Sequence, residues 1–265
     1  MTSNMRVQGA CSLAGVGGTH GLELVILREG TDMTPVFYSQ NVDFFSSARM
    51  PQNRTLFLLG GRPPDAGWLR DLVDRNSPDV WAVDSGAGIC RRAGVVPRVM
   101  IGDMDSVGSG DREWAVEHGA VEHRHPRAKD LTDFQLALQL LREESPDSLL
   151  LLSGCFGGRL DHLFSVVNTF AASGSLCMAD EIEGLFLMSP KNEVRAVFKS
   201  APLAVSLLPL SEECKGVSIK GVRWPLSDAA LSRSYPCAVS NETEGDVHAL
   251  CEEGLLGLYW RSSQK

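Results

Sequence analysis

The sequence predicts an α/β fold: an open, mostly parallel sheet with flanking helices, followed by a C-terminal β-sandwich. Between residues 54 and 172, short apolar runs alternate with helical patterns, as in open α/β sheets. These apolar runs end in glycines and carboxylates, which is typical of strands whose carboxyl ends form a ligand crevice. Beyond about residue 176 the helical period gives way to short β-like runs.

The first strand, 55–59, is a continuous apolar run closed by Gly60-Gly61, as expected of a strand buried on both faces. Pro63-Pro64 opens the first helix and Gly94 ends the second. The remaining elements of this half are expected, in order, as strand 80–83, helix 89–93, strand 99–101, helix 111–118, a short step at 120–121, helix 131–142, strand 148–153, and a helix whose apolar side carries Leu160, Leu163, Phe164, Val167 and Phe170.

The C-terminal half predicts a separate β domain over residues 176–265. Its expected strands are 204–208, 217–219, 238–240, 247–250 and 255–260. Residues 1–53 form an N-terminal extension, in which the apolar stretch 22–27 is a possible added edge strand. The chain is therefore divided into 1–53, 54–175 and 176–265.

Charge and composition exclude several classes of protein. The 265 residues hold 25 basic and 33 acidic side chains, and no basic stripe indicates nucleic-acid binding. No apolar run approaches the ~18–20 residues that span a bilayer, and no secretory signal is visible, so we expect a cytoplasmic protein. The seven cysteines form no C-x-x-C pair, which argues against a zinc site or a disulfide framework.

The sharpest motif, Gly102-Asp-Met-Asp-Ser106, directly follows an apolar strand. In extended backbone Asp103 and Asp105 would point the same way and Met104 into the protein. Two carboxylates in one small volume suit Mg²⁺, which takes carboxylates together with waters and phosphate oxygens. The alternative is a polar turn that caps the next helix.

A second acidic pair, Asp130 and Asp133, stands at the start of the helix expected at 131–142. Asp130 is a good helix cap, and Asp133 would complete something like a capping box. The apolar side of this helix nevertheless leaves both carboxylates together on a neighbouring face, where they could reach the crevice. Both interpretations, a helix cap and a metal ligand, therefore remain open for this pair.

Two glycine turns at strand ends are candidate phosphate sites. Gly157-Gly158-Arg159 offers backbone amides at a helix N-terminus with a charged side chain beside them, although it lacks the lysine of a Walker loop. The turn 84–88 is another glycine-containing turn after a strand. Both turns are also consistent with ordinary connections between a strand and a helix. His123 and His125 are expected in a solvated loop.

In their order, these segments resemble the thiamine pyrophosphokinase (thiamine diphosphokinase) family. Two C-terminal segments, Gly221-Val-Arg-Trp-Pro-Leu226 and Ser240-Asn-Glu242, look like further elements of that family, and the resemblance covers about residues 55–260. Met104 replaces the family's usual Phe. In the turn 84–88, Ser85 and Gly88 depart from the commonest form of the family's motif.

The resemblance implies transfer of the pyrophosphoryl group of ATP to the hydroxyl of thiamine, giving thiamine diphosphate and AMP. It implies a nucleotide-binding catalytic domain at 54–175, a thiamine-binding β-sandwich at 176–265, and a homodimer that holds thiamine between its subunits. The implied residues are Asp103, Asp105 and Asp133 for Mg²⁺; Asp103, Asp105, Asp130 and Asp133 for catalysis; Asp84, Gly86, Lys129, Gly157, Gly158, Arg159 and Asp161 for ATP; and Trp224, Ser240 and Asn241 for thiamine.

Within this function, Asp130 or Asp133 could activate the thiamine hydroxyl as a base, or merely orient it. Three other functions would use the same residues. A metal-dependent sugar-nucleotide transferase or a phosphoesterase could also use the acidic cluster. A protein that binds nucleotide or thiamine as a sensor, without turnover, could keep the same pocket.

Overall fold

The computed structural model describes residues 32–126 and 130–263. The possible edge strand at 22–27 lies outside these residues. Fifteen strands and five helices are described, and the strands form two sheets.

The larger sheet has nine strands, in the order β11-β15-β9-β8-β7-β3-β4-β5-β6. Its parallel part consists of β3 (Arg54–Leu58), β4 (Asp79–Val83), β5 (Val99–Gly102), β6 (Val121–Arg124), β7 (Leu149–Ser153) and β8 (Cys177–Ala179). It continues, antiparallel, through β9 (Glu183–Met188), β15 (Leu256–Arg261) and β11 (Ala204–Pro209).

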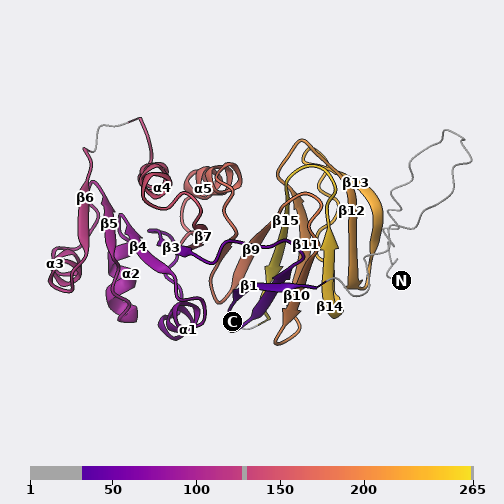
Figure 1. Cartoon of the computed structure of the whole chain (residues 1–265), viewed down its shortest axis with the longest axis horizontal. Helices are drawn as coiled ribbons and strands as arrows, with labels where there is room; N and C mark the ends of the chain where they lie inside the picture. Colours follow the sequence, from indigo (N-terminus) through magenta and orange to yellow (C-terminus); the bar gives the residue numbers. More distant parts are fainter. Residues whose placement is uncertain (1–31, 127–129, 264–265) are drawn as a thin grey trace, which may run out of the picture.

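Helices cover both faces of the parallel part (Figure 1). One face carries α1 (Ala66–Asn76), α2 (Gly86–Ala93) and α3 (Ser109–Glu117), and the other carries α4 (Asp133–Glu144) and α5 (Leu160–Ala172). The two-sided cover explains the continuous apolar strand runs, because neighbouring residues such as Leu56 and Phe57 point to opposite faces and are both fully buried.

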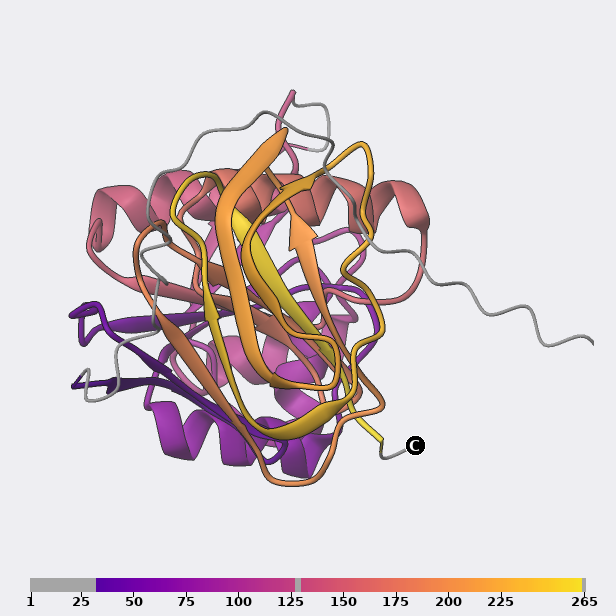
Figure 2. The same cartoon turned by 90° about the vertical axis from the view of Figure 1, so that its right-hand side faces the viewer.

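The second sheet is antiparallel and has six strands. Their order is β1 (Thr34–Tyr38), β2 (Val42–Ser46), β10 (Val194–Phe198), β14 (Thr243–Leu250), β12 (Glu213–Val222) and β13 (Leu226–Ser232). It packs on the antiparallel end of the larger sheet, where the Phe44 and Phe186 rings stack with their centroids 4.3 Å apart. Figure 2 looks at this sandwich end of the molecule, with α1 and α5 on opposite sides of the strands.

The predicted fold class is confirmed, with one correction to the sandwich. Strands β9, β15 and β11 extend the parallel sheet instead of forming a sheet of their own, so a single sheet runs through both halves. The hairpin β1–β2, which the sequence analysis missed, extends the six-stranded sheet by pairing β2 with β10. It is also tied to α1, because the Asn76 side-chain amide exchanges hydrogen bonds with the Tyr38 backbone (3.1 and 2.7 Å).

Three local expectations were wrong. The segment 238–240 is not a strand, since Ser240 has a left-handed φ of 60° that extended chain does not allow. Helix α4 begins at Asp133 and is capped by Thr132, which forms a capping box with Gln135. His123 lies within β6 rather than in a loop.

Candidate active site

A cavity of about 570 Å³ opens at the carboxyl ends of β3, β4 and β7. This is the edge where the sequence predicts the ligand crevice. Its polar lining comes from three of the predicted segments, while Leu59, Val83, Phe134, Leu163 and Val166 give it apolar walls. The predicted residues that line it are Asp84, Asp133, Gly157, Gly158, Arg159 and Asp161.

Two glycine-rich turns form one wall of this cavity. Gly154, Gly157 and Gly158 all have left-handed φ values, of 64°, 70° and 68°, which side chains with a Cβ rarely adopt. The turn after β3 lies against them, and a Cβ on Gly61 would lie 2.7 Å from each of the Gly154 and Phe156 carbonyl oxygens. The sequence analysis treated Gly60-Gly61 only as the end of a strand, yet both residues line the cavity.

Asp84 lies at the centre of a group of acidic residues. It follows β4 with a left-handed φ of 53°, and its Oδ1 accepts a short hydrogen bond from the Ser106 hydroxyl. Burial raises the pKa of the Asp84 carboxyl; the Ser106 hydrogen bond opposes this, and the charges of Asp133 and Asp103 raise it further. Asp103 and Asp133 therefore lie close enough to Asp84 to disfavour its ionised form.

The chain turns at Gly102–Ser106 instead of running on extended. Met104 is buried, as expected, but it is placed there by a left-handed φ of 64° and not by strand alternation. Asp103 Oδ1 accepts a hydrogen bond from the Asp105 backbone N–H (2.9 Å). Both aspartates line a neighbouring hollow of about 390 Å³, together with Arg124, His125 and Pro126.

The second acidic pair is divided by the start of α4. Asp133 is the first residue of the helix and faces the cavity, whereas Asp130 is exposed and lines neither hollow. Lys129 lies outside the described residues.

Arg159 and Asp161, both expected at the ATP site, form an ion pair with each other (2.5 Å). The hydrogen bond from Arg159 lowers the pKa of the Asp161 carboxyl. Gly86 is placed differently from the other predicted ATP residues: it is buried, and a Cβ there would lie 1.8 Å from the Leu58 carbonyl oxygen. Its small size lets α2 approach β3, and it does not line the cavity.

The donor chemistry fits Mg²⁺, although the carboxylates do not form a complete site. Within residues 32–126 and 130–263, no group of three or more His, Cys, Asp or Glu is arranged to hold a metal ion. Mg²⁺ uses few protein carboxylates and fills its octahedron with waters and phosphate oxygens. Asp103 and Asp133 lie near enough to Asp84 to raise its pKa, so a cation among them would relieve repulsion.

The predicted thiamine residues form a separate surface patch. Trp224 is 54% exposed, and its backbone exchanges two hydrogen bonds with the Asn241 side chain. The Arg223 guanidinium covers one face of the Trp224 ring at 5.1 Å and is held by Glu242. Trp224, Ser240 and Asn241 line neither hollow at the acidic edge.

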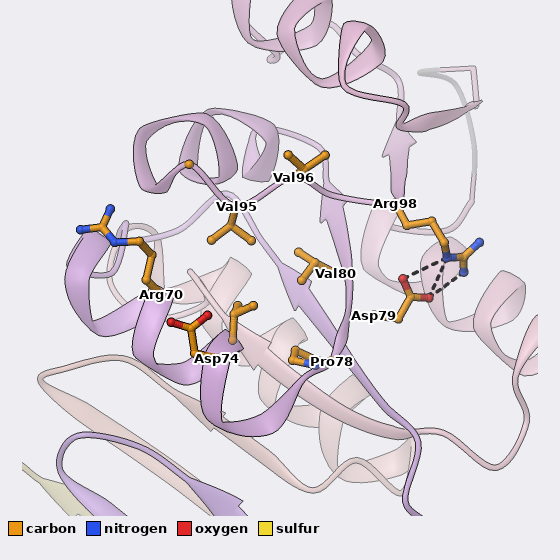
Figure 3. Close-up of a pocket in the computed structure, with 10 residues that line it drawn as sticks. Arg70, Asp74, Pro78, Asp79, Val80, Val95, Val96 and Arg98 are labelled. Carbon is orange, nitrogen blue, oxygen red and sulfur yellow. Dashed lines mark hydrogen bonds and ion pairs between the residues drawn. The ribbon is translucent and has the colours of Figure 1, made fainter.

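Another hollow, of about 450 Å³, lies at the opposite ends of the strands (Figure 3). It is lined by residues of α1, by the start of β4 and by the loop 94–98 that leads into β5, and none of the predicted site residues contributes to it. Beside it, Arg98 binds Asp79 and Glu144 at 2.7 and 2.8 Å.

Family comparisons agree with this division into two sites. Residues 71–177 match the model described as thiamin pyrophosphokinase, catalytic domain, and residues 199–256 match the one described as thiamin pyrophosphokinase, vitamin B1 binding domain. Together they span more than half of the chain. The chain belongs to the thiamine pyrophosphokinase family. The first match contains most of the residues that line the acidic cavity, including Asp84, Asp133 and Gly157, and the second contains Trp224 and Asn241.

Individual members of the family are distant relatives. The thiamine pyrophosphokinase of Bacillus subtilis is 27% identical over 201 residues, which cover 71% of this chain and 89% of the relative. The crystal structure from Bacillus subtilis superposes with a TM-score of 0.68 at 22% identity, covering 80% of this chain and all of that one. The structure from Geobacillus thermodenitrificans gives a TM-score of 0.64 at 24% identity and covers 80% and 99%. At such identities these structures establish the shared fold.

Proposed function

We propose that this protein is a thiamine pyrophosphokinase, which transfers the pyrophosphoryl group of ATP to the hydroxyl of thiamine and releases AMP. One observation carries the proposal: the chain matches both the catalytic and the vitamin B1 binding domain, and the cavity at the strand ends brings Asp84 and Asp133 together with the glycine turn.

ATP is the proposed donor, with its phosphates at the glycine turn. Backbone N–H groups of Gly157 and Gly158 precede the N-terminus of α5, where anions are favoured. Arg159 would turn from Asp161 toward the phosphates, because a phosphate offers the same bidentate acceptor geometry as a carboxylate. Mg²⁺ would be held by Asp103, Asp105 and Asp133, with Asp84 beside them.

Pyrophosphoryl transfer depends mainly on alignment and on neutralising charge. A bound Mg²⁺ would supply the positive charge that the phosphate chain and the acidic group both require. Asp133 faces the cavity and is the better placed of the two candidate bases, so we propose that it orients or deprotonates the thiamine hydroxyl. Asp130, being exposed, would contribute less.

We propose a homodimer that brings the thiamine patch of one subunit to the acidic cavity of the other. On one chain, Trp224 does not line the cavity. Beside the cavity, α5 exposes 79% of Leu160 and 70% of Phe164, which the sequence analysis placed on the apolar side of this helix. Large exposed apolar side chains on adjacent turns favour a protein interface, and a second copy would cover them.

The cellular location stays a prediction. Among the described residues, none of the helices combines the length and apolar character that crossing a bilayer requires. We keep the cytoplasm as the expected compartment.

The proposed activity is tested by incubating purified protein with thiamine, ATP and Mg²⁺. Thiamine diphosphate is followed as its fluorescent thiochrome derivative, while AMP is separated from ADP. Equimolar thiamine diphosphate and AMP, abolished by a chelator, would establish pyrophosphoryl transfer. ADP as the product, or tight binding of thiamine and ATP without product, would instead favour a different phosphotransferase or a sensor.

A further inference from the structure

Arg62 directly follows the cavity-lining pair Gly60-Gly61, and its backbone holds the glycine turn. Its N–H donates to the Phe156 carbonyl oxygen (2.7 Å), next to the Gly61 N–H that donates to the Gly154 carbonyl oxygen (2.6 Å). These two bonds continue the pairing of β3 with β7 beyond the ends of both strands. The Arg62 guanidinium also lies 5.9 Å from the centre of the Phe156 ring.

The same side chain reaches the strands that belong to the sandwich. Its Nε and Nη2 donate to Asp180 Oδ2 at 3.0 and 2.6 Å, and Nη2 also donates to Glu183 Oε1 at 2.6 Å. Glu183 is the first residue of β9, and its Oε2 accepts from the Tyr259 hydroxyl on β15 (2.8 Å). One guanidinium therefore connects the glycine turn to two antiparallel strands.

The side chain of Asp180 is completely buried, and its other oxygen accepts from the Ile182 and Glu183 backbone N–H groups at 2.9 Å each. Burial lowers the pKa of the Arg62 guanidinium, but its hydrogen bonds to Glu183 and Asp180 and their negative charges outweigh this, and the pKa ends above its ordinary value. Because a planar guanidinium donates in fixed directions, this arrangement defines a single position for the turn. A lysine would keep the charge but lose the forked geometry.

We propose that Arg62 is a positioning residue for ATP: it fixes the phosphate-binding turn Gly154–Gly158 against β9, so that the shape of the phosphate site depends on the sandwich half. This inference rests on the proposed function of that turn. Arg62 itself does not line the cavity, and it would act through the turn rather than by touching the substrate.

A purely structural role is the competing explanation, and the chain contains a matched control for it. Arg98 also bridges two carboxylates, Asp79 and Glu144, but at the opposite ends of the strands. Figure 3 shows its contact with Asp79. Replacement of either arginine by lysine removes a forked ion-pair contact. Only the change at Arg62 should alter the phosphate site.

The experiment compares Arg62→Lys with Arg98→Lys in the full-length protein. Binding of Mg-ATP and of thiamine is measured separately by calorimetry, and hydrogen exchange is followed in peptides covering residues 154–159. We expect Arg62→Lys to weaken ATP binding by ~10- to 100-fold, the size of effect that a small displacement of a binding group produces. Thiamine affinity should stay within about twofold, and exchange should accelerate in 154–159 only for Arg62→Lys.

A milder variant, Glu183→Gln, covers the case in which Arg62→Lys folds poorly. It removes the charge of one carboxylate and leaves the Asp180 contact, so we expect a smaller loss of ATP affinity in the same direction. The inference is overturned if folded variants at Arg62 and Glu183 lose thermal stability but bind ATP like the wild type. If the wild type itself neither binds ATP nor forms thiamine diphosphate, the proposed function fails as well, and the two failures are thereby distinguished.

Discussion

Asn241 and Trp224 are joined by two reciprocal hydrogen bonds. Asn241 Oδ1 accepts from the Trp224 backbone N–H (3.1 Å), and Asn241 Nδ2 donates to the Trp224 carbonyl oxygen (2.7 Å). Oδ1 also accepts from the Glu242 N–H at 3.0 Å. The amide expected to bind thiamine is therefore largely engaged in holding the tryptophan turn, and it would act on thiamine mainly through Trp224.

Replacing Asn241 should weaken thiamine binding by releasing Trp224. We expect Asn241→Ala to raise the KM for thiamine by ~10- to 30-fold, from the loss of two hydrogen bonds worth about 1 kcal/mol each. Asn241→Asp can keep the bond from the Trp224 N–H but not the donated one, so it should lie between wild type and Asn241→Ala. Steady-state kinetics with each substrate varied in turn would measure both variants.

Ser240→Ala is the neighbouring control. Ser240 contacts the sheet through its backbone N–H, which donates to the Ser206 hydroxyl (3.0 Å) and survives the substitution. A thiamine KM that rises more for Ser240→Ala than for Asn241→Ala would mean that the serine hydroxyl, and not the tryptophan turn, dominates recognition.

The parallel half of the fold was predictable because its local signals agree with its tertiary surroundings. Strands β3, β4, β5 and β7 are apolar on both faces, and the structure covers both faces with helices. The hairpin β1–β2 was missed, since its runs are short and its pairing partner β10 lies about 150 residues away. Nothing local to residues 34–46 specifies such a distant partner.

The sequence predicts which segments form the site, but not how their side chains are arranged in it. Parallel strand ends must share one edge, so Asp84 and Gly157 were expected together, whereas Asp133, at a helix start, was left open between helix cap and ligand. Whether a residue faces the ligand depends on turns that the strand pattern cannot describe, such as the left-handed φ of Met104. The ion pairs of Arg62 are equally invisible in sequence, because Asp180 lies 118 residues away.

Removing the charge of Asp84 should stabilise the protein while abolishing activity. A carboxyl with a raised pKa in the folded state favours folding below its unfolded pKa, and that contribution is lost as the pH rises through the folded pKa. Asp84→Asn avoids this loss at neutral pH, so we expect a gain of about 2 °C in Tm. Scanning calorimetry at pH 4 and pH 7 should show the gain at pH 7.

Asp74→Asn is the matched control for this change, because Asp74 is exposed at the opposite ends of the strands. It should leave both Tm and activity unchanged. A lower Tm for Asp84→Asn at pH 7 would contradict the repulsion inferred among Asp84, Asp103 and Asp133.

The Mg²⁺ assignment predicts a large kinetic effect at Asp105. Asp105→Asn should reduce kcat by about two to three orders of magnitude, as expected for a carboxylate that holds a catalytic metal. Asp130→Asn, outside both hollows, should retain most of the activity. Varying Mg²⁺ at saturating substrates gives the decisive comparison, and a nearly active Asp105→Asn with an unchanged Mg²⁺ requirement would refute the assignment.

The proposed dimer predicts that a charge on the exposed side of α5 separates the subunits. Phe164 is 70% exposed in one chain, so Phe164→Glu should fold normally but place an unpaired carboxylate in the interface. Analytical sedimentation should then give the mass of a single chain, whereas the wild type should give the mass of two chains. The thiamine KM should rise at least tenfold, with ATP affinity nearly retained because the cavity lies within one chain.

Val96→Glu is the control, an equally drastic change at a side chain that is 43% exposed on the opposite edge. It should alter neither the oligomeric state nor the thiamine KM. A Phe164→Glu protein that remains dimeric with wild-type kinetics would place the interface elsewhere, and Leu203 and Tyr235, each 69% exposed, would then be the next positions to change.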